Sequence, residues 1–186
     1  MSQLYPGEQL VGAYLSIVED CDLVSYNQRS REQGQQLELD VVGVESTNGT
    51  QTVFACEVVT HLDGRLYTGT SSTNRWTEFG NESYQHSLEK VWQKFERSHG
   101  YVRDVFDDAE DYRLQLWATR VSEGYLTNGL AQLAVEFEEE HGVPLELVIN
   151  EEYTSRIDEL RDVAASTTKA YGQPGFRYLQ ILENLQ

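Results

Sequence analysis

The sequence has little positive charge. It carries 14 lysine and arginine residues against 31 aspartate and glutamate residues, a formal net charge of −17, and its lysines are Lys90, Lys94 and Lys169. Non-specific nucleic-acid binding depends on cations that neutralise phosphates, so this balance opposes such binding unless the acidity has another origin. Adaptation to a salt-accumulating cell is one such origin, and a basic protein partner is another.

Membrane, export and nucleotide-binding signals are also missing. No run approaches the roughly 18 apolar residues of a membrane span, and the first residues lack the basic-then-apolar pattern of a signal peptide. Cys21 and Cys56 lack metal-ligand spacing, so we expect a reduced, cytoplasmic protein. Neither a glycine-rich phosphate loop nor a Gly-x-Ser-x-Gly elbow occurs. The four histidines show no His-x3-His spacing, which disfavours a zinc site.

The composition is that of a folded globule. Hydrophobic residues make up 39% of the chain, with three Trp, eleven Tyr and six Phe. A length of 186 residues corresponds to one domain of ordinary size. No internal repeat and no linker rich in Pro, Gly or Ser divides it. We therefore predict a single domain over residues 1–186.

The dipeptide Asn48-Gly49 is the strongest local signal. It separates two apolar stretches, 36–45 and 52–61, and so predicts a β-hairpin. If it forms the two-residue turn, opposed residue numbers sum to 97, and Asp40 faces Glu57 with Cβ atoms about 4.5–5.5 Å apart. Alternation then gives two faces: one holds Glu38, Asp40, Val42, Val44, Val53, Ala55, Glu57 and Val59, and the other Leu37, Leu39, Val41, Phe54, Cys56 and Val58.

The facing acids need compensation. A strand pair that is apolar on both faces belongs to the middle of a sheet, where two carboxylates repel and lose hydration unless a proton or a cation intervenes. A divalent metal bound by Asp40 and Glu57 is the prediction that follows. A one-residue bulge would instead move one carboxylate to the opposite face, and Glu38 or Glu57 could lie at a solvated strand end.

Hydrophobic periodicity predicts the remaining elements. We expect strands at 23–29, 113–121 and 145–150, and helices at 7–20, 87–97, 127–140, 153–165 and from Pro174 onward. The helix at 87–97 carries Lys90 and Lys94 beside an apolar stripe formed by Leu88, Val91, Trp92 and Phe95. Residues 62–82 form a long loop with Arg65, Tyr67, Arg75 and Trp76, which is either a nucleic-acid contact or an ordinary surface loop. The acid run at 138–140 is expected to face solvent.

The order of these features resembles the PD-(D/E)XK nuclease superfamily, nearest its Holliday-junction-resolvase-like and YraN-like branches. The resemblance covers about residues 5–61 and rests on Gly7-Glu8, Asn27-Gln28-Arg29, Glu38-Leu39-Asp40 and Glu57-Val58-Val59. It implies an α/β fold: a restriction-endonuclease-like αβββαβ core with a central mixed sheet over about 5–121, and a C-terminal α-β-α-α extension over about 122–186. The lysine of the motif is replaced by Val59.

The resemblance also implies a function, a metal-dependent nuclease that hydrolyses phosphodiester bonds of DNA. Mg²⁺ (or Mn²⁺) would be held by Asp40, Glu57, the carbonyl of Val58 and, as a further candidate, Glu8. Either Lys90, which we prefer, or Lys94 would replace the motif lysine, with His61 as a third candidate.

Resolvase-like relatives often pair, so a homodimer is one implied arrangement. The alternative is a catalytically inactive nuclease fold that binds nucleic acid or protein, which Val59 and the acidity favour.

Overall fold

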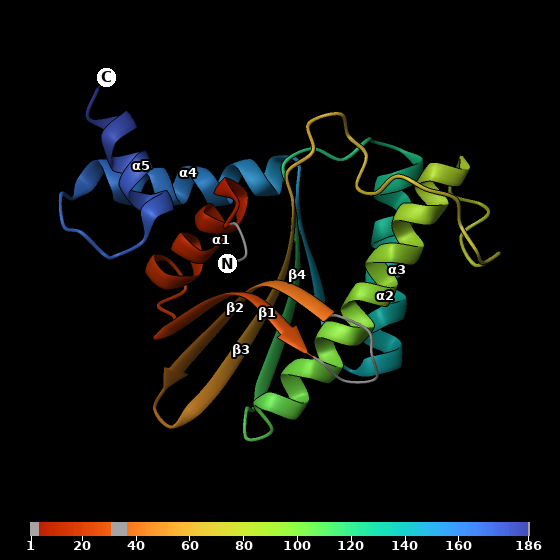
Figure 1. Cartoon of the computed structure of the whole chain (residues 1–186), viewed down its shortest axis with the longest axis horizontal. Helices are drawn as coiled ribbons and strands as arrows, with labels where there is room; N and C mark the ends of the chain where they lie inside the picture. The colour runs from red at the N-terminus through yellow and green to blue at the C-terminus, as the bar shows by residue number, and fades with distance from the viewer. Residues whose placement is uncertain (1–3, 31–36, 186) are drawn as a thin grey trace.

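Five strands form one mixed sheet in the computed structural model, which describes residues 4–30 and 37–185 (Figure 1). The elements run in the predicted order, so the α/β class is confirmed. They are α1 (Pro6–Ile17), β1 (Leu23–Ser30), β2 (Leu37–Thr47), β3 (Thr50–Val59), α2 (Glu82–Val105), β4 (Asp111–Ala118), α3 (Tyr125–His141), β5 (Leu145–Ile149), α4 (Glu151–Ser166) and α5 (Pro174–Glu183). Residue 36, where one predicted strand began, lies outside the described residues.

The sheet has the strand order β1-β2-β3-β4-β5. Strands β1, β2 and β3 are antiparallel neighbours, whereas β3, β4 and β5 are parallel. Parallel neighbours need crossover connections, and α2 and α3 provide them. Helix α2 begins at Glu82, earlier than predicted, because the side chain of Asn81 caps it by accepting a hydrogen bond of 3.0 Å from the backbone N–H of Tyr84.

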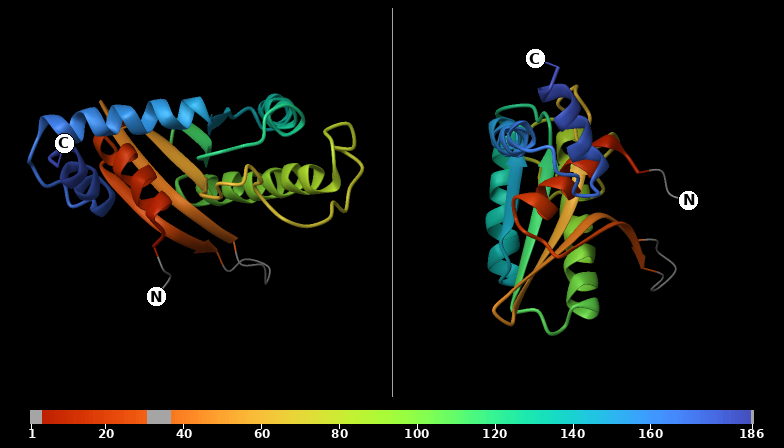
Figure 2. Two further views of the ribbon diagram at one scale, coloured as in Figure 1. Left: turned by 90° about the horizontal axis from the view of Figure 1, so that it is seen from above. Right: turned by 90° about the vertical axis from the view of Figure 1, so that its left-hand side faces the viewer.

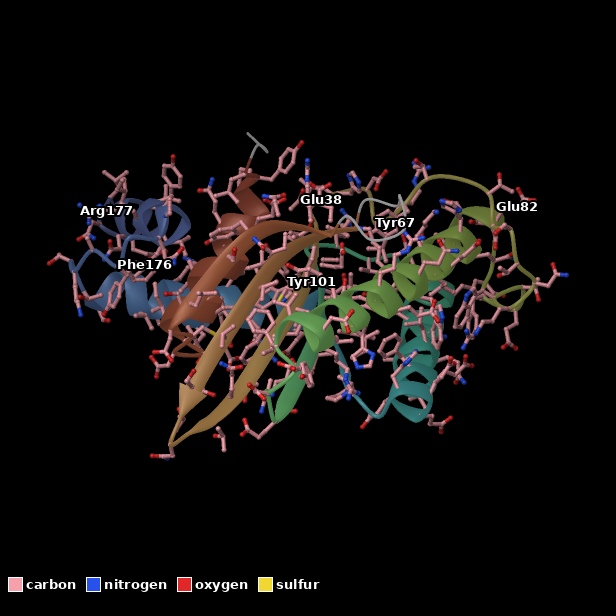
Figure 3. All side chains as sticks on the ribbon, turned by 60° about the horizontal axis from the view of Figure 1, so that its bottom comes forward. Glu38, Tyr67, Glu82, Tyr101, Phe176 and Arg177 are labelled. Atoms are coloured by element: carbon pink, nitrogen blue, oxygen red, sulfur yellow. The ribbon has the colours of Figure 1, made fainter. Side chains whose placement is uncertain are left out.

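Helices cover both faces of the sheet. Helices α2 and α3 pack on one face in a core that includes Trp92, Phe95 and Phe137. Helices α1, α4 and α5 pack on the other face, where Tyr14, Trp117 and Phe176 are buried together. The two groups lie to either side of the strands in Figure 1 and in the left view of Figure 2. The labelled Phe176 on α5 and Glu82 at the start of α2 lie toward opposite ends of the molecule (Figure 3).

The hairpin forms in the predicted register. The pairs from Val41↔Cys56 to Thr47↔Thr50 all sum to 97, and Asn48 and Gly49 have φ values of +54° and +86°, as a type I′ turn requires. The ladder ends at Val41↔Cys56, one pair before Asp40 and Glu57. Beyond that pair β2 continues with β1 alone, while β3 continues beside β4 as far as Val59↔Ala118. The sheet therefore splits next to the two acids.

A kink in β1 and β2 lies at the same split. Asn27 has φ +51°, and the β1–β2 ladder passes from Tyr26↔Val41 to Gln28↔Leu39, so it skips Asn27 and Asp40. The skipped pair reverses the alternation, and Leu39 joins the α2–α3 core although Val41 lies in the other one. The prediction that Leu39 shares a face with Val41 was wrong, because the regular pairing of β2 with β1 is interrupted at Asp40, between these two residues.

The segment between β3 and α2 is largely exposed, but two of its side chains anchor it to the core. Leu66 is fully buried and Trp76 is 2% exposed, and both belong to the core under α2 and α3. Trp76 is therefore unable to stack on a base, whereas Arg65 and Arg75 of the same loop are exposed. Within residues 4–30 and 37–185, no helix is long and apolar enough to cross a membrane.

Candidate active site

Asp40 bridges the split in the sheet. Its Oδ2 accepts a hydrogen bond of 2.8 Å from the backbone N–H of Val58, so the side chain takes over where the β2–β3 ladder stops. This contact fixes the carboxylate between the two strands. It also places the Asp40 charge beside Glu57, the residue that precedes Val58 on β3.

Glu57 is a buried acid with an incomplete set of partners. Its side chain is 1% exposed, and Oε2 lies 2.5 Å from Nζ of Lys94. No group among the described residues donates a hydrogen bond to Oε1, which is also buried. Burial raises the pKa of Glu57 to about 8; Lys94 lowers the pKa, and the neighbouring Asp40 carboxylate raises it. A shared proton or a cation would satisfy Oε1.

Lys94 on α2 is the lysine that contacts Glu57, beside Asp40. Burial lowers its pKa, but Glu57, Tyr67 and Asp40 raise it by more, so the ammonium form is favoured. Its Nζ lies 5.5 Å from the centroid of the Tyr67 ring, and Tyr67 lies beside α2 in Figure 3. Lys90, which we preferred from the sequence, instead places Nζ 3.4 Å from the side chain of Gln93 on its own helix.

Glu8 lies in the first turn of α1, on the face of the sheet opposite α2. It is 5% exposed, and its Oε2 accepts hydrogen bonds from the backbone N–H of Tyr5 (3.1 Å) and from Nδ2 of Asn27 (3.2 Å). Burial raises its pKa, the two hydrogen bonds lower it, and the charges of Asp40 and Glu38 raise it. Asn27 therefore links the kink to the acid on α1. The sequence analysis used Asn27 in the family resemblance but gave it no role at the site, although asparagine within a strand is a signal for positive φ.

The remaining predicted residues are spread around this centre. Val58 contributes its N–H to Asp40, and Val59 is 6% exposed in the α2–α3 core. His61 is exposed, and its backbone carbonyl lies 3.4 Å from the hydroxyl of Thr119. Arg75 stacks on Trp92, with 3.6 Å from Cζ to the ring centroid, and pairs with Glu136 at 2.8 Å.

The donor set fits a hard cation held by two carboxylates. Asp40 and Glu57 offer oxygens only, which Mg²⁺ prefers, and Mg²⁺ retains several waters. The unpartnered Oε1 of Glu57 is the feature that such an ion would complete. Glu8 does not join Asp40 and Glu57 in one cluster of metal-ligand atoms: within the described residues, the group of three ligand-type side chains in mutual reach is Glu96, Glu140 and His141.

One surface cavity lies apart from the acids. It has a volume of about 870 Å³ and is lined by residues that follow β4 and β5, among them Arg120, Ser122, Asn150 and Asp158. Asn150 also links the segments that follow β4 and β5. Its Oδ1 accepts a hydrogen bond from the backbone N–H of Val121 at 2.7 Å, and its Nδ2 donates to the carbonyl of Val121 at 3.1 Å. None of Asp40, Glu57 and Lys94 lines the cavity.

Comparison with known proteins finds no matching family model, no similar curated protein and no similar solved structure. The residues and their geometry therefore carry the functional argument.

Proposed function

We propose that this chain is a metal-dependent nuclease of the PD-(D/E)XK kind that hydrolyses phosphodiester bonds of DNA with Mg²⁺ (or Mn²⁺). Its restriction-endonuclease-like core would run from α1 to β4, with α3 to α5 as the C-terminal extension. One observation carries the proposal: α2 brings Lys94 to within 2.5 Å of the Glu57 carboxylate, beside Asp40. A lysine thus reaches the acid pair although Val59 occupies the strand position where the family has one.

The proposed roles follow from charge and burial. Asp40 and Glu57 would bind the cation, which supplies an activated water and offsets phosphate charge. Glu8, held by Asn27, would add negative charge from the other side. Lys94 would act as a fixed cation that positions the water and stabilises charge, rather than as a general base, because its pKa is raised above the ordinary value of lysine.

Cleavage of labelled DNA tests the proposal. Single-stranded, duplex and branched substrates would be incubated with Mg²⁺ or Mn²⁺ at low and molar salt. We expect metal-dependent cutting that Asp40→Asn abolishes, with the fold retained because the Asn amide oxygen can still accept from the Val58 N–H. Lys94→Met should lower cleavage by at least about a hundredfold. Lys90→Met is the matched control and should cut like wild type, because Lys90 contacts Gln93 rather than the acids.

Wild-type cutting by Asp40→Asn, or equal losses in Lys90→Met and Lys94→Met, would refute the assignment of these roles. The second candidate function is a nuclease fold that binds a partner without cleaving it. The contact that favours it is the Lys94–Glu57 ion pair, since it already neutralises one of the two carboxylates. Absence of cleavage on every substrate and at every salt concentration, with the fold intact, would select this second function.

A further inference from the structure

Helices α2 and α3 bring a second group of ligand-type side chains together, away from Asp40. Glu96 lies on α2, and Glu140 and His141 end α3; the ligand atoms of these three residues all lie within 4.8 Å of one another. Nε2 of His141 is 4.0 Å from Oε1 of Glu140, while the other oxygen of Glu140 is 4.0 Å from Nη2 of Arg75. Glu140 can therefore face His141 and Arg75 at once.

His99 extends this group. It follows Glu96 by three residues on α2, and residues three apart share a helix face. Its side chain is 8% exposed, and its ring centroid is 5.4 Å from that of His141. In the described part of the chain, Nε2 of His99 and Nε2 of His141 are both buried and have no hydrogen-bond partner. Two adjoining imidazole nitrogens without partners are costly unless something binds them.

Aromatic contacts account for the buried position of the imidazole rings, but they give neither Nε2 atom a hydrogen-bond partner. His141 lies 4.3 Å from the Phe137 ring and 6.0 Å from the Trp92 ring, centroid to centroid. A neutral imidazole offers a lone pair at one ring nitrogen to a metal ion.

We propose that Glu96, Glu140 and His141, with His99 adjoining, bind one divalent transition-metal ion such as Zn²⁺. Mixed imidazole and carboxylate donors suit Zn²⁺, whereas Mg²⁺ takes oxygen ligands. The site therefore differs in chemistry from the Asp40–Glu57 pair, and it does not rest on the proposed nuclease function. The ion would pin the end of α3 to the middle of α2. The absence of His-x3-His spacing disfavoured zinc in the sequence, because that pattern concerns histidines within one helix. These ligands come from two helices, α2 and α3.

Zn²⁺ titration by calorimetry on the chelator-treated full chain tests the site, with millimolar Mg²⁺ present to occupy oxygen-only sites. We expect one equivalent to bind, with affinity lowered at least about tenfold in Glu96→Gln and in His141→Gln, because loss of a ligand should cost no less than loss of a group that hydrogen-bonds to a ligand. His61→Gln and His86→Gln are matched controls that remove histidines elsewhere and should bind like wild type. Glu96 is exposed, so its variant should fold.

A second readout places the ion. Co²⁺ quenches a nearby indole, and Trp92 adjoins His141, so saturable quenching that Zn²⁺ reverses is expected in wild type and lost in His141→Gln. No saturable Zn²⁺ binding in wild type would overturn the proposal. So would wild-type affinity in both Glu96→Gln and His141→Gln, or an equal loss of affinity in His61→Gln.

Discussion

The buried carboxyl of Glu57 should make stability depend on pH in a way that one substitution removes. Its pKa is raised from 4.5 to about 8 in the folded protein. A raised pKa means that the folded state holds its proton more tightly than the unfolded state. The stabilising contribution is therefore complete below about pH 4.5 and is lost as the pH rises through about 8.

The size of the effect follows from the pKa difference. Each pH unit across that interval corresponds to about 1.4 kcal/mol, which sets a ceiling of about 5 kcal/mol between pH 4.5 and 8. Glu57→Gln keeps the shape of the side chain but cannot ionise. We expect the free energy of unfolding of the wild type, relative to Glu57→Gln, to fall by roughly 2–4 kcal/mol from pH 5 to pH 8.5.

Urea denaturation of both proteins at several pH values in this range measures the difference directly. Subtracting the variant removes the contribution of the other 30 acids, which both chains share. A difference that stays flat from pH 5 to 8.5 would refute the reasoning, because Glu57 would then titrate alike in the folded and unfolded chains. A difference that grows with pH would refute it more strongly, since it would give Glu57 a lowered pKa.

Three further predictions concern Lys94, Asn27 and Gly12. Lys94→Met should lower the free energy of unfolding by roughly 3–5 kcal/mol at pH 8.5 but by much less at pH 5, because it leaves the Glu57 charge buried and unpaired; equal losses at both values in urea melts would contradict this. Asn27→Ala should be less stable than Asn27→Gly by roughly 1–2 kcal/mol, since φ is +51°, and equal melting temperatures would count against the kink. In Gly12→Ala the new Cβ would lie 2.1 Å from the Tyr26 hydroxyl oxygen, so a loss of roughly 1–3 kcal/mol is expected. Gly100→Ala, with open space around it, is its control and should gain up to about 1 kcal/mol.

The element order and the hairpin register could be read from the sequence because both rest on local signals. Asn48-Gly49 fixes the turn and so the pairing of β2 with β3. The apolar stripe on α2 identifies the buried side of the helix, and Leu88, Val91, Trp92 and Phe95 are all in the core.

The choice between Lys90 and Lys94 could not be read from the sequence. The two lysines are one helical turn apart, so they lie on the same side of α2. Which of them meets β3 depends on where along its length the helix crosses the sheet, and tertiary packing sets that point. The approach of His99 on α2 to His141 on α3 could not be predicted for the same reason, because β4 lies between these two helices in the sequence.

The kink at Asn27 has a consequence for local opening. Because both strands skip the same position, the β1–β2 ribbon consists of two short ladders rather than one long one. The outer ladder, from Gln28↔Leu39 onward, can separate without disturbing the pairs around Val42. We expect amide hydrogens of the outer ladder to exchange with solvent through small openings, and those of the inner ladder to exchange only when the whole sheet unfolds.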